Sequence, residues 1–248
     1  MSNKIENQVA FVTGSNRGIG RAIVETLLAR GASKVYAAAR DIGKLGELKD
    51  KHGDRLIPVQ LDVTNPQQIA EAGEVAQDAT ILINNAGYFA NTSLPDGDLE
   101  TIRAEFEINY FGPLQLTQTF APILKNQNGG TIVNISSVAG LSNFPAFPTY
   151  SDSKAAVHSL TSATRLLLSA QGTQVIGVYP GPVDTDMAKD VDMPKATPES
   201  VAIQILDGIE QGTDEVFPDE FAENYRAPYE AGQKTLESRI AQMLQQPA

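Results

Sequence analysis

The fold of this chain is decided near its start by the stretch VAFVTGSNRGIG, which runs from Val9 to Gly20. Residues 9–13 form a compact apolar run that predicts a buried strand, and the amphipathic pattern of residues 18–30, ended by Gly31, predicts a helix. Glycines at the junction let the backbone turn tightly and approach a pyrophosphate, while the helix presents free N–H groups to it. The spacing is G-x-x-x-G-x-G, and no Gly-Lys-Ser/Thr follows it as in a Walker-type loop. The stretch therefore indicates a dinucleotide site on the first strand–helix unit.

Short apolar runs and helical patterns alternate along the rest of the chain. Further strands are predicted at 34–39, 56–61, 80–84, 131–136, 174–179 and, as a short edge, 215–217; helices are predicted at 69–77, 99–124, 150–170 and 198–211. A kink is expected at Gly112-Pro113. Such alternation predicts an α/β fold with a parallel sheet covered by helices on both faces. We find no linker, so residues 1–248 are expected to form a single domain.

Composition narrows the functional classes. The chain has 248 residues, 42% of them hydrophobic, and a formal net charge of −11, which argues against nucleic acid and anionic membranes as partners. The absence of cysteine excludes disulfides and thiolate metal sites, and the aspartates of residues 183–192 lack the spacing of a calcium loop, so no metal is expected. Residues 1–8 are polar and no apolar run is long enough to span a bilayer, which favours a cytoplasmic location.

A tyrosine and a lysine carry the strongest chemical signal. Tyr150 and Lys154 are four residues apart and share one face of the predicted helix. An ammonium beside a phenol favours the phenolate, so we expect a lowered pKa at Tyr150 and a role as general acid or base. Ser137 lies thirteen residues before Tyr150. Its rival, Ser136, should point to the opposite face of the strand.

Three other polar residues are not expected to take part in the chemistry. Ser153 is predicted to be a plain helix residue, His158 to pack or contact solvent, and His52 to lie at the surface. With so few histidines, a Ser–His nucleophile is not favoured.

Taken together, these motifs resemble the short-chain dehydrogenase/reductases, over residues 8 to about 205. The matching residues are Thr13-Gly14, Gly18-Ile19-Gly20, Asn84-Asn85-Ala86-Gly87, Asn109, Ser137, Tyr150, Lys154 and Pro180-Gly181. The resemblance implies a doubly wound, Rossmann-like parallel sheet of about seven strands and a nicotinamide cofactor. It is the NADP-preferring carbonyl reductases of the family that the chain resembles.

The resemblance also implies a set of cofactor-binding residues in four groups. The glycine-rich turn would contribute Gly14, Ser15, Asn16, Arg17, Gly18, Ile19 and Gly20, and the adenine edge would contact Asp62 and Val63. The adenosine ribose side would meet Asn85, Ala86 and Gly87, and the nicotinamide carboxamide would meet Pro180, Gly181, Val183 and Thr185. Asn84 is expected to stabilise the sheet.

The second strand bears on the choice between NADP(H) and NAD(H). NAD-binding sites place an acid at its end, where this chain has Ala39 followed by Arg40. Arg40 can offer a 2′-phosphate a bidentate hydrogen bond, and Arg17 could approach the same phosphate. NADP(H) is therefore favoured. NAD(H) stays possible, because a register error of two would place Asp41 at the acid position.

The implied reaction is hydride transfer between NADPH and a carbonyl compound. Tyr150 would donate a proton to the developing alkoxide, Lys154 would lower the pKa of Tyr150, Ser137 would hold the substrate oxygen, and Asn109 would position a water molecule between Lys154 and solvent. The alternatives are an NAD-linked alcohol dehydrogenase and, from another class, a catalytically silent dinucleotide sensor.

The remaining segments concern substrate and assembly. Residues 181–197 are predicted to form a substrate loop or lid, and residues 221–248 a charged helical tail. Apolar residues expected to line a pocket for an aryl or alkyl ketone or aldehyde are Tyr88, Phe89, Leu141, Phe144, Phe147, Tyr179 and Met187. A homodimer through residues 99–124 and 150–170 is expected, with a homotetramer as the alternative.

Overall fold

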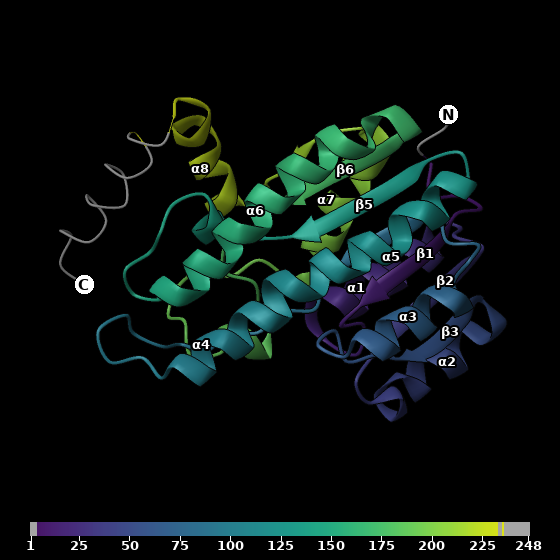
Figure 1. Cartoon of the computed structure of the whole chain (residues 1–248), viewed down its shortest axis with the longest axis horizontal. Helices are drawn as coiled ribbons and strands as arrows, with labels where there is room; N and C mark the ends of the chain where they lie inside the picture. Colours follow the sequence, from purple (N-terminus) through teal and green to yellow (C-terminus); the bar gives the residue numbers. More distant parts are fainter. Residues whose placement is uncertain (1–3, 233–234, 236–248) are drawn as a thin grey trace.

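Seven parallel strands form one sheet in the computed structural model, which describes residues 4–232 and 235 (Figure 1). The strands are β1 (Val9–Thr13), β2 (Lys34–Ala39), β3 (Leu56–Gln60), β4 (Ile81–Asn84), β5 (Gly130–Ile135), β6 (Thr173–Val178) and β7 (Glu215–Val216). Their order, β3-β2-β1-β4-β5-β6-β7, reverses between β1 and β4. This confirms the predicted doubly wound fold, and the reversal marks the point where such sheets bind ligands.

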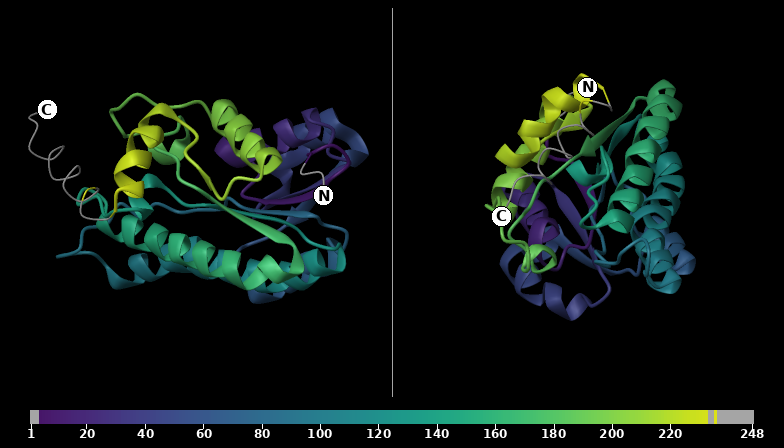
Figure 2. Two further views of the ribbon diagram at one scale, coloured as in Figure 1. Left: turned by 90° about the horizontal axis from the view of Figure 1, so that it is seen from above. Right: turned by 90° about the vertical axis from the view of Figure 1, so that its left-hand side faces the viewer.

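Helices cover both faces of this sheet, as the two side views in Figure 2 show. One face packs against α1 (Gly18–Ala29), α2 (Gly46–His52) and α7 (Pro198–Gln211), and the other against α3 (Pro66–Val75), α5 (Gly112–Asn126) and α6 (Pro148–Leu168). α4 (Leu99–Phe106) leads into α5, and α8 (Glu220–Glu230) lies on the α7 side. Within the part of the chain that the structure describes, none of the helices has the length and apolar character needed to span a membrane.

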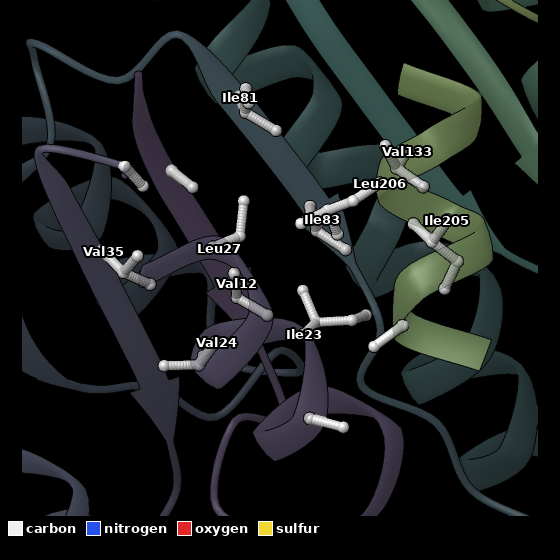
Figure 3. Close-up of a cluster of buried hydrophobic side chains, with 14 of the residues drawn as sticks. Val12, Ile23, Val24, Leu27, Val35, Ile81, Ile83, Val133, Ile205 and Leu206 are labelled. Atoms are coloured by element: carbon white, nitrogen blue, oxygen red, sulfur yellow. The ribbon is translucent and has the colours of Figure 1, made fainter. Parts of the chain in front are cut away.

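The core follows the two-residue alternation of the strands. Val12 of β1 points toward α1, where it lies with Ile23 and Leu27 (Figure 3). Phe11 belongs to the cluster on the opposite face. Both faces of β1 are therefore apolar, as expected for a central parallel strand. Burying each large side chain of this kind contributes about 1.5–3 kcal/mol to folding, which fixes the register of the strands that carry the site.

Two features of the helices differ from the sequence-based expectation. α2 was not predicted, because its segment is polar and shows only one buried residue, Leu48. The predicted helix 99–124 is interrupted by a π-helical turn, Glu107–Phe111, which precedes the expected kink at Gly112-Pro113. Pro113 lacks a backbone N–H and cannot continue the regular hydrogen-bond ladder, so the register changes just before it.

The predicted lid is a loop whose two ends are joined. Val183 and Ala196 form an isolated parallel bridge, in which Asp184 N donates to Ala196 O (2.9 Å) and Ala196 N donates to Pro182 O (3.0 Å). The only regular turn inside it is the 3-10 helix Asp186–Ala188. The predicted helical tail is helical over α8, and its residues 233–234 and 236–248 lie outside the described residues.

Candidate active site

The glycine-rich turn is locked to the segment that follows β4. The Thr13 hydroxyl oxygen accepts hydrogen bonds from Asn85 N (3.0 Å) and Ala86 N (2.9 Å), and Asn85 Nδ2 donates to Thr13 O (2.9 Å). Gly14 has φ +66°, and a Cβ on Gly20 would lie 2.2 Å from Gly14 O. Only glycine fits these two positions, so the turn must follow this path.

The same turn fits a pyrophosphate. Arg17 begins α1 without a side-chain cap, so the first backbone N–H groups of the helix are available to an anion. Asn16 and Ile19 are partly buried beside these groups. Ser15 does not face them, because its hydroxyl donates to Val12 O (2.6 Å) and its N donates to Ala38 O (3.0 Å). Ser15 thus fixes the turn to β2 instead.

No carboxylate stands at the carboxyl end of β2. Ala39 is the last residue of that strand and is buried, and Arg40 after it is exposed. Asp41 caps the 3-10 helix Ile42–Leu45 by accepting a hydrogen bond from Gly43 N (3.0 Å). The strand end is therefore compatible with a 2′-phosphate, and Asp41 already has a structural partner.

Arg17 departs from the expectation that it approaches the same phosphate as Arg40. Its guanidinium forms an ion pair with Asp186 of the lid, and both side chains are well exposed. The lid also meets the turn at Thr185, whose methyl group would lie 3.0 Å from a Cβ on Gly18. These contacts join the lid to the glycine-rich turn.

Some of the other predicted cofactor residues are exposed, and others are buried or already hydrogen-bonded within the protein. Gly87 is exposed beside Asn109 and Lys154, whereas Val63 is buried behind Asp62, whose Oδ1 accepts a hydrogen bond from Thr64 N (3.0 Å).

The segment after β6 is held by α8 and by the core. Gly181 N donates to Asp219 Oδ2 (2.9 Å), and the Val183 side chain is buried. Pro180 O accepts hydrogen bonds from Val138 N (3.1 Å) and from Ser137 Oγ (3.3 Å). The Gly181 N–H is therefore engaged by Asp219, and the role predicted for this segment beside the carboxamide stays a prediction.

Tyr150, Lys154 and Ser137 come together at the carboxyl ends of β4 and β5. Lys154 is only 4% exposed, its Nζ donates to Ile135 O (2.9 Å), and this nitrogen lies 5.7 Å from the centre of the Tyr150 ring. Ser137 Oγ accepts a hydrogen bond from Ala139 N (3.2 Å), and its hydroxyl acts to lower the pKa of the Tyr150 phenol. The structure thus assembles the three residues that the sequence singled out.

Asn109 completes this group from the π-helical turn. Its Oδ1 accepts a hydrogen bond from Tyr88 N (2.8 Å), and its Nδ2 donates to Tyr88 O (2.8 Å) and to Ser153 Oγ (2.9 Å). A Cβ on Gly87 would lie 3.5 Å from Asn109 Oδ1 and 3.7 Å from Lys154 Nζ, so the two side chains flank the same glycine.

Ser153 is more than the plain helix residue that was predicted. It is fully buried, and while it accepts the bond from Asn109 it donates to Tyr150 O (2.8 Å). Ser153 therefore connects the π-helical turn to α6 between Tyr150 and Lys154. Sequence gave no signal for this, because the contact joins helices 44 residues apart.

Two neighbouring residues lie where the alternation predicts. Ser136 is buried and donates to Lys154 O (2.9 Å), so it supports α6 from behind and leaves Ser137 in the site. Asn84 Nδ2 donates to Asn134 Oδ1 (2.8 Å), a contact between β4 and β5.

Of the residues predicted to line a substrate pocket, one group of aromatic side chains lies around Tyr150. The Phe89 ring meets the Tyr150 ring edge-on, with centroids 5.2 Å apart and planes at 88°, and the Phe147 centroid lies 6.2 Å from that of Tyr150. Phe144 stacks on Phe147 at 5.4 Å. Leu141 packs nearby, and Tyr88 and Met187 are exposed.

Tyr179 does not belong to this wall, contrary to the prediction. It is 1% exposed and packs against Phe217 and Tyr229, and its hydroxyl lies 2.8 Å from His158 Nδ1. His158 therefore has the packing role that was expected of it. Tyr179 instead packs between His158 of α6 and Tyr229 of α8.

The pKa of Tyr150 shifts in the direction opposite to the one predicted from the neighbouring Lys154. Burial raises the pKa of Tyr150, the negative charge of Glu105 raises it further, and the hydrogen bond with Ser137 opposes both. Burial lowers the pKa of Lys154 to about 8, against the opposing effect of Glu105. We predicted a lowered pKa at Tyr150; instead the Lys154 ammonium is engaged by Ile135 O, and desolvation dominates.

Comparison with known proteins identifies relatives over nearly the whole chain. The family model described as short chain dehydrogenase matches residues 8–196. An uncharacterized oxidoreductase of Staphylococcus saprophyticus is 32% identical over 84% of this chain and 93% of its own, and an oxidoreductase of Botryotinia fuckeliana is 33% identical over 73% and 68%. The crystal structure of a short chain dehydrogenase from Burkholderia cenocepacia in complex with NADP is 38% identical, covers 98% of this chain and 100% of its own, and has a TM-score of 0.90.

Proposed function

The chain belongs to the short-chain dehydrogenase family and is an oxidoreductase, and we propose that it reduces a ketone or aldehyde to an alcohol with NADPH, reversibly. The observation that carries the proposal is the meeting of Ser137, Tyr150, Lys154 and Asn109 at the carboxyl ends of β4 and β5, beside a turn that fits a pyrophosphate. Ligands bind there in doubly wound sheets.

In this proposal the protein places the substrate and supplies the proton. The bound nicotinamide supplies the hydride. Ser137 Oγ exchanges its hydrogen bond to Pro180 O for one to the substrate oxygen, and Tyr150 Oη protonates the alkoxide that forms there. A raised pKa keeps Tyr150 protonated at neutral pH, so the free protein is poised as an acid, which suits reduction. The Lys154 ammonium adds a positive charge beside the developing negative one.

The preference for NADP(H) rests on the end of β2. Ala39 offers no carboxylate there, Asp41 is occupied with Gly43 N, and Arg40 is exposed beside them. A guanidinium can bind a 2′-phosphate through two charge-assisted hydrogen bonds. The NADP complex of the Burkholderia relative supports this preference. NAD-linked alcohol oxidation is the second candidate within the same chemistry.

The substrate we propose is an aryl or alkyl carbonyl compound. Phe89 and Phe147 surround the Tyr150 ring, so an apolar group carried by the carbonyl carbon would bury surface against them.

The test follows NADPH oxidation at about 340 nm, where reduced nicotinamide absorbs, with a panel of aryl and alkyl ketones. Tyr150→Phe should lower kcat at least about 100-fold, as expected for loss of a general acid. Tyr110→Phe, which loses the same hydroxyl outside the group, should keep the parental rate, and circular dichroism should show both variants folded. Bound NADPH without turnover across the panel would refute the proposal and favour a dinucleotide sensor.

We also propose a homodimer formed through α4–α5 and α6. Leu166 and Leu167 near the end of α6 are 76% and 77% exposed, an unusual position for two neighbouring leucines on a monomer. Covering them would remove apolar surface from water.

A further inference from the structure

A glutamate inside the protein faces the group of four from α4. Glu105 is 0% exposed, and its Oε1 accepts a hydrogen bond from Ala90 N (2.8 Å). Its Oε2 is also buried and has no hydrogen-bond partner among the described residues. A buried carboxylate held by one backbone N–H is costly unless an opposite charge compensates it. We therefore examine which neighbouring groups could compensate the charge of Glu105.

Glu105 and Asn109 are one turn apart and hold the same extended segment. Asn109 binds the N–H and C=O of Tyr88, and Glu105 binds the N–H of Ala90. Phe89 lies between these two attachment points, with its ring edge-on to the Tyr150 ring. The two helix side chains therefore fix residues 88–90 and aim Phe89 at the phenol.

The charge of Glu105 acts on both members of the Tyr150–Lys154 pair. It opposes the desolvation that lowers the pKa of Lys154, and it adds to the desolvation that raises the pKa of Tyr150. Lys154 is buried as well, so the charge of Glu105 acts on it where water is excluded and an opposite charge is strongly felt.

Among residues 4–232, the other groups that the structure places against Tyr150 and Lys154 are uncharged. These groups are Ser137 after β5, Asn109 of the π-helical turn, the Ile135 carbonyl of β5 and Ser153 of α6 itself. One turn farther along α6, His158 is hydrogen-bonded to the Tyr179 hydroxyl, and its pKa responds to the charges of Glu215 and Arg165.

We propose that Glu105 is a positioning residue of this site, which clamps residues 88–90 against Tyr150 and serves as the buried counter-charge of Lys154. The clamp orients the aromatic wall that meets the substrate. The charge holds Tyr150 in its protonated, proton-donating form and keeps Lys154 an ammonium to higher pH. The inference rests on the proposed carbonyl reduction for its kinetic readout but not for its titration readout.

The first test is the pH profile of Glu105→Gln, which keeps an oxygen for Ala90 N and removes the charge. The basic limb of kcat/KM, set by Lys154, should move to lower pH by about one unit, the shift that one nearby charge typically causes. Glu107→Gln removes an exposed carboxylate two residues away and should leave the limb in place. Glu105→Asp keeps the charge and should keep the limb within about half a unit of the parent.

The second test needs no turnover. The Lys154 ammonium can be titrated by NMR of ¹³Cε-labelled lysine in the cofactor-free protein, with Lys154→Arg to assign the signal. The parental midpoint should lie near 8 and should be lower in Glu105→Gln. Equal Lys154 midpoints in the parent and in Glu105→Gln would overturn the role of Glu105 as a counter-charge. The same conclusion would follow if the midpoint in Glu105→Asp, which keeps the charge, were lowered as much as that in Glu105→Gln. A parent inactive with every carbonyl tested would refute only the proposed function.

The clamp has its own readout. Glu105→Ala leaves Ala90 N without its acceptor, so the Ala90 amide should exchange with solvent at least about tenfold faster than in Glu105→Gln, and KM for an aryl ketone should rise above the Glu105→Gln value. Equal exchange rates in these two variants would overturn the clamp.

Discussion

Replacing Ser153 by alanine should expose how much the site depends on a residue that touches neither substrate nor cofactor. Ser153 Oγ accepts one of the two N–H bonds of Asn109 Nδ2 (2.9 Å) and donates to Tyr150 O (2.8 Å). Alanine keeps the helix and removes only the hydroxyl. The Asn109 amide would then keep its bond to Tyr88 O and lose its second acceptor.

The cost follows from burial. Asn109 is 1% exposed and Ser153 fully buried, so water cannot replace the lost acceptor. An unsatisfied buried donor costs about 1–3 kcal/mol. The freed carbonyl of Tyr150 stays within α6, so we assign it no large additional cost. For a protein of this size a loss of about 2 kcal/mol lowers Tm by about 4–8 °C.

The assay is thermal unfolding at fixed protein concentration, with kcat measured on the same preparations. Ser159→Ala, an exposed serine of the same helix, is the matched control and should change the free energy of unfolding by less than about 0.5 kcal/mol. A double-mutant cycle with Asn109→Ala should give a coupling of about 1 kcal/mol, because without Asn109 the Ser153 hydroxyl no longer accepts this hydrogen bond. If Ser153→Ala is as stable as Ser159→Ala and the cycle shows no coupling, Ser153 does not anchor Asn109 and the assembly we describe is wrong.

Three further predictions concern cofactor, pH and assembly. Arg40→Ala should raise KM for NADPH about 10-fold or more while leaving KM for NADH unchanged, since it loses charge-assisted hydrogen bonds of about 1.5–3 kcal/mol. Lys44→Ala, at an exposed residue of the 3-10 helix that follows, is the control, and unaltered use of NADPH by Arg40→Ala would refute the cofactor argument. Because the pKa of Lys154 is lowered to about 8, its ammonium is lost as pH rises through that value, so kcat/KM for reduction should fall above it. Lys154→Arg should carry that limb to higher pH because a guanidinium keeps its charge, and a limb indifferent to this change would assign it to another group. Leu167→Glu should give a monomer by light scattering if α6 forms the dimer interface, whereas a parent that is already monomeric would contradict the proposed dimer.

The positions of the strands and the glycine-rich turn were predictable because their causes are local. Two-residue alternation, capping glycines and apolar runs act over a few neighbouring residues, and Gly14 and Gly20 sit where no side chain fits. The Tyr150–Lys154 pair was equally readable, since positions four apart must share a helix face.

The missed features have two causes, a segment without periodicity and contacts between distant segments. α2 has one buried residue, Leu48, and so shows no periodicity. The ion pair of Arg17 joins it to Asp186, 169 residues away, and no pattern near either residue indicates it. Glu105 was readable only as a charged residue on a helix, although an acid four positions before Asn109 shares that residue's inward face.

By itself, the sequence determined which groups are available for chemistry: a phenol, an ammonium and a hydroxyl at spacings that a strand and a helix bring to one edge, and a turn that accepts only glycine. The tertiary structure alone decided the charge state of those groups. Burial, the Ile135 carbonyl and the carboxylate of Glu105 set the pKa values of Tyr150 and Lys154, because desolvation and through-space charge depend on what surrounds a side chain rather than on its neighbours in the chain.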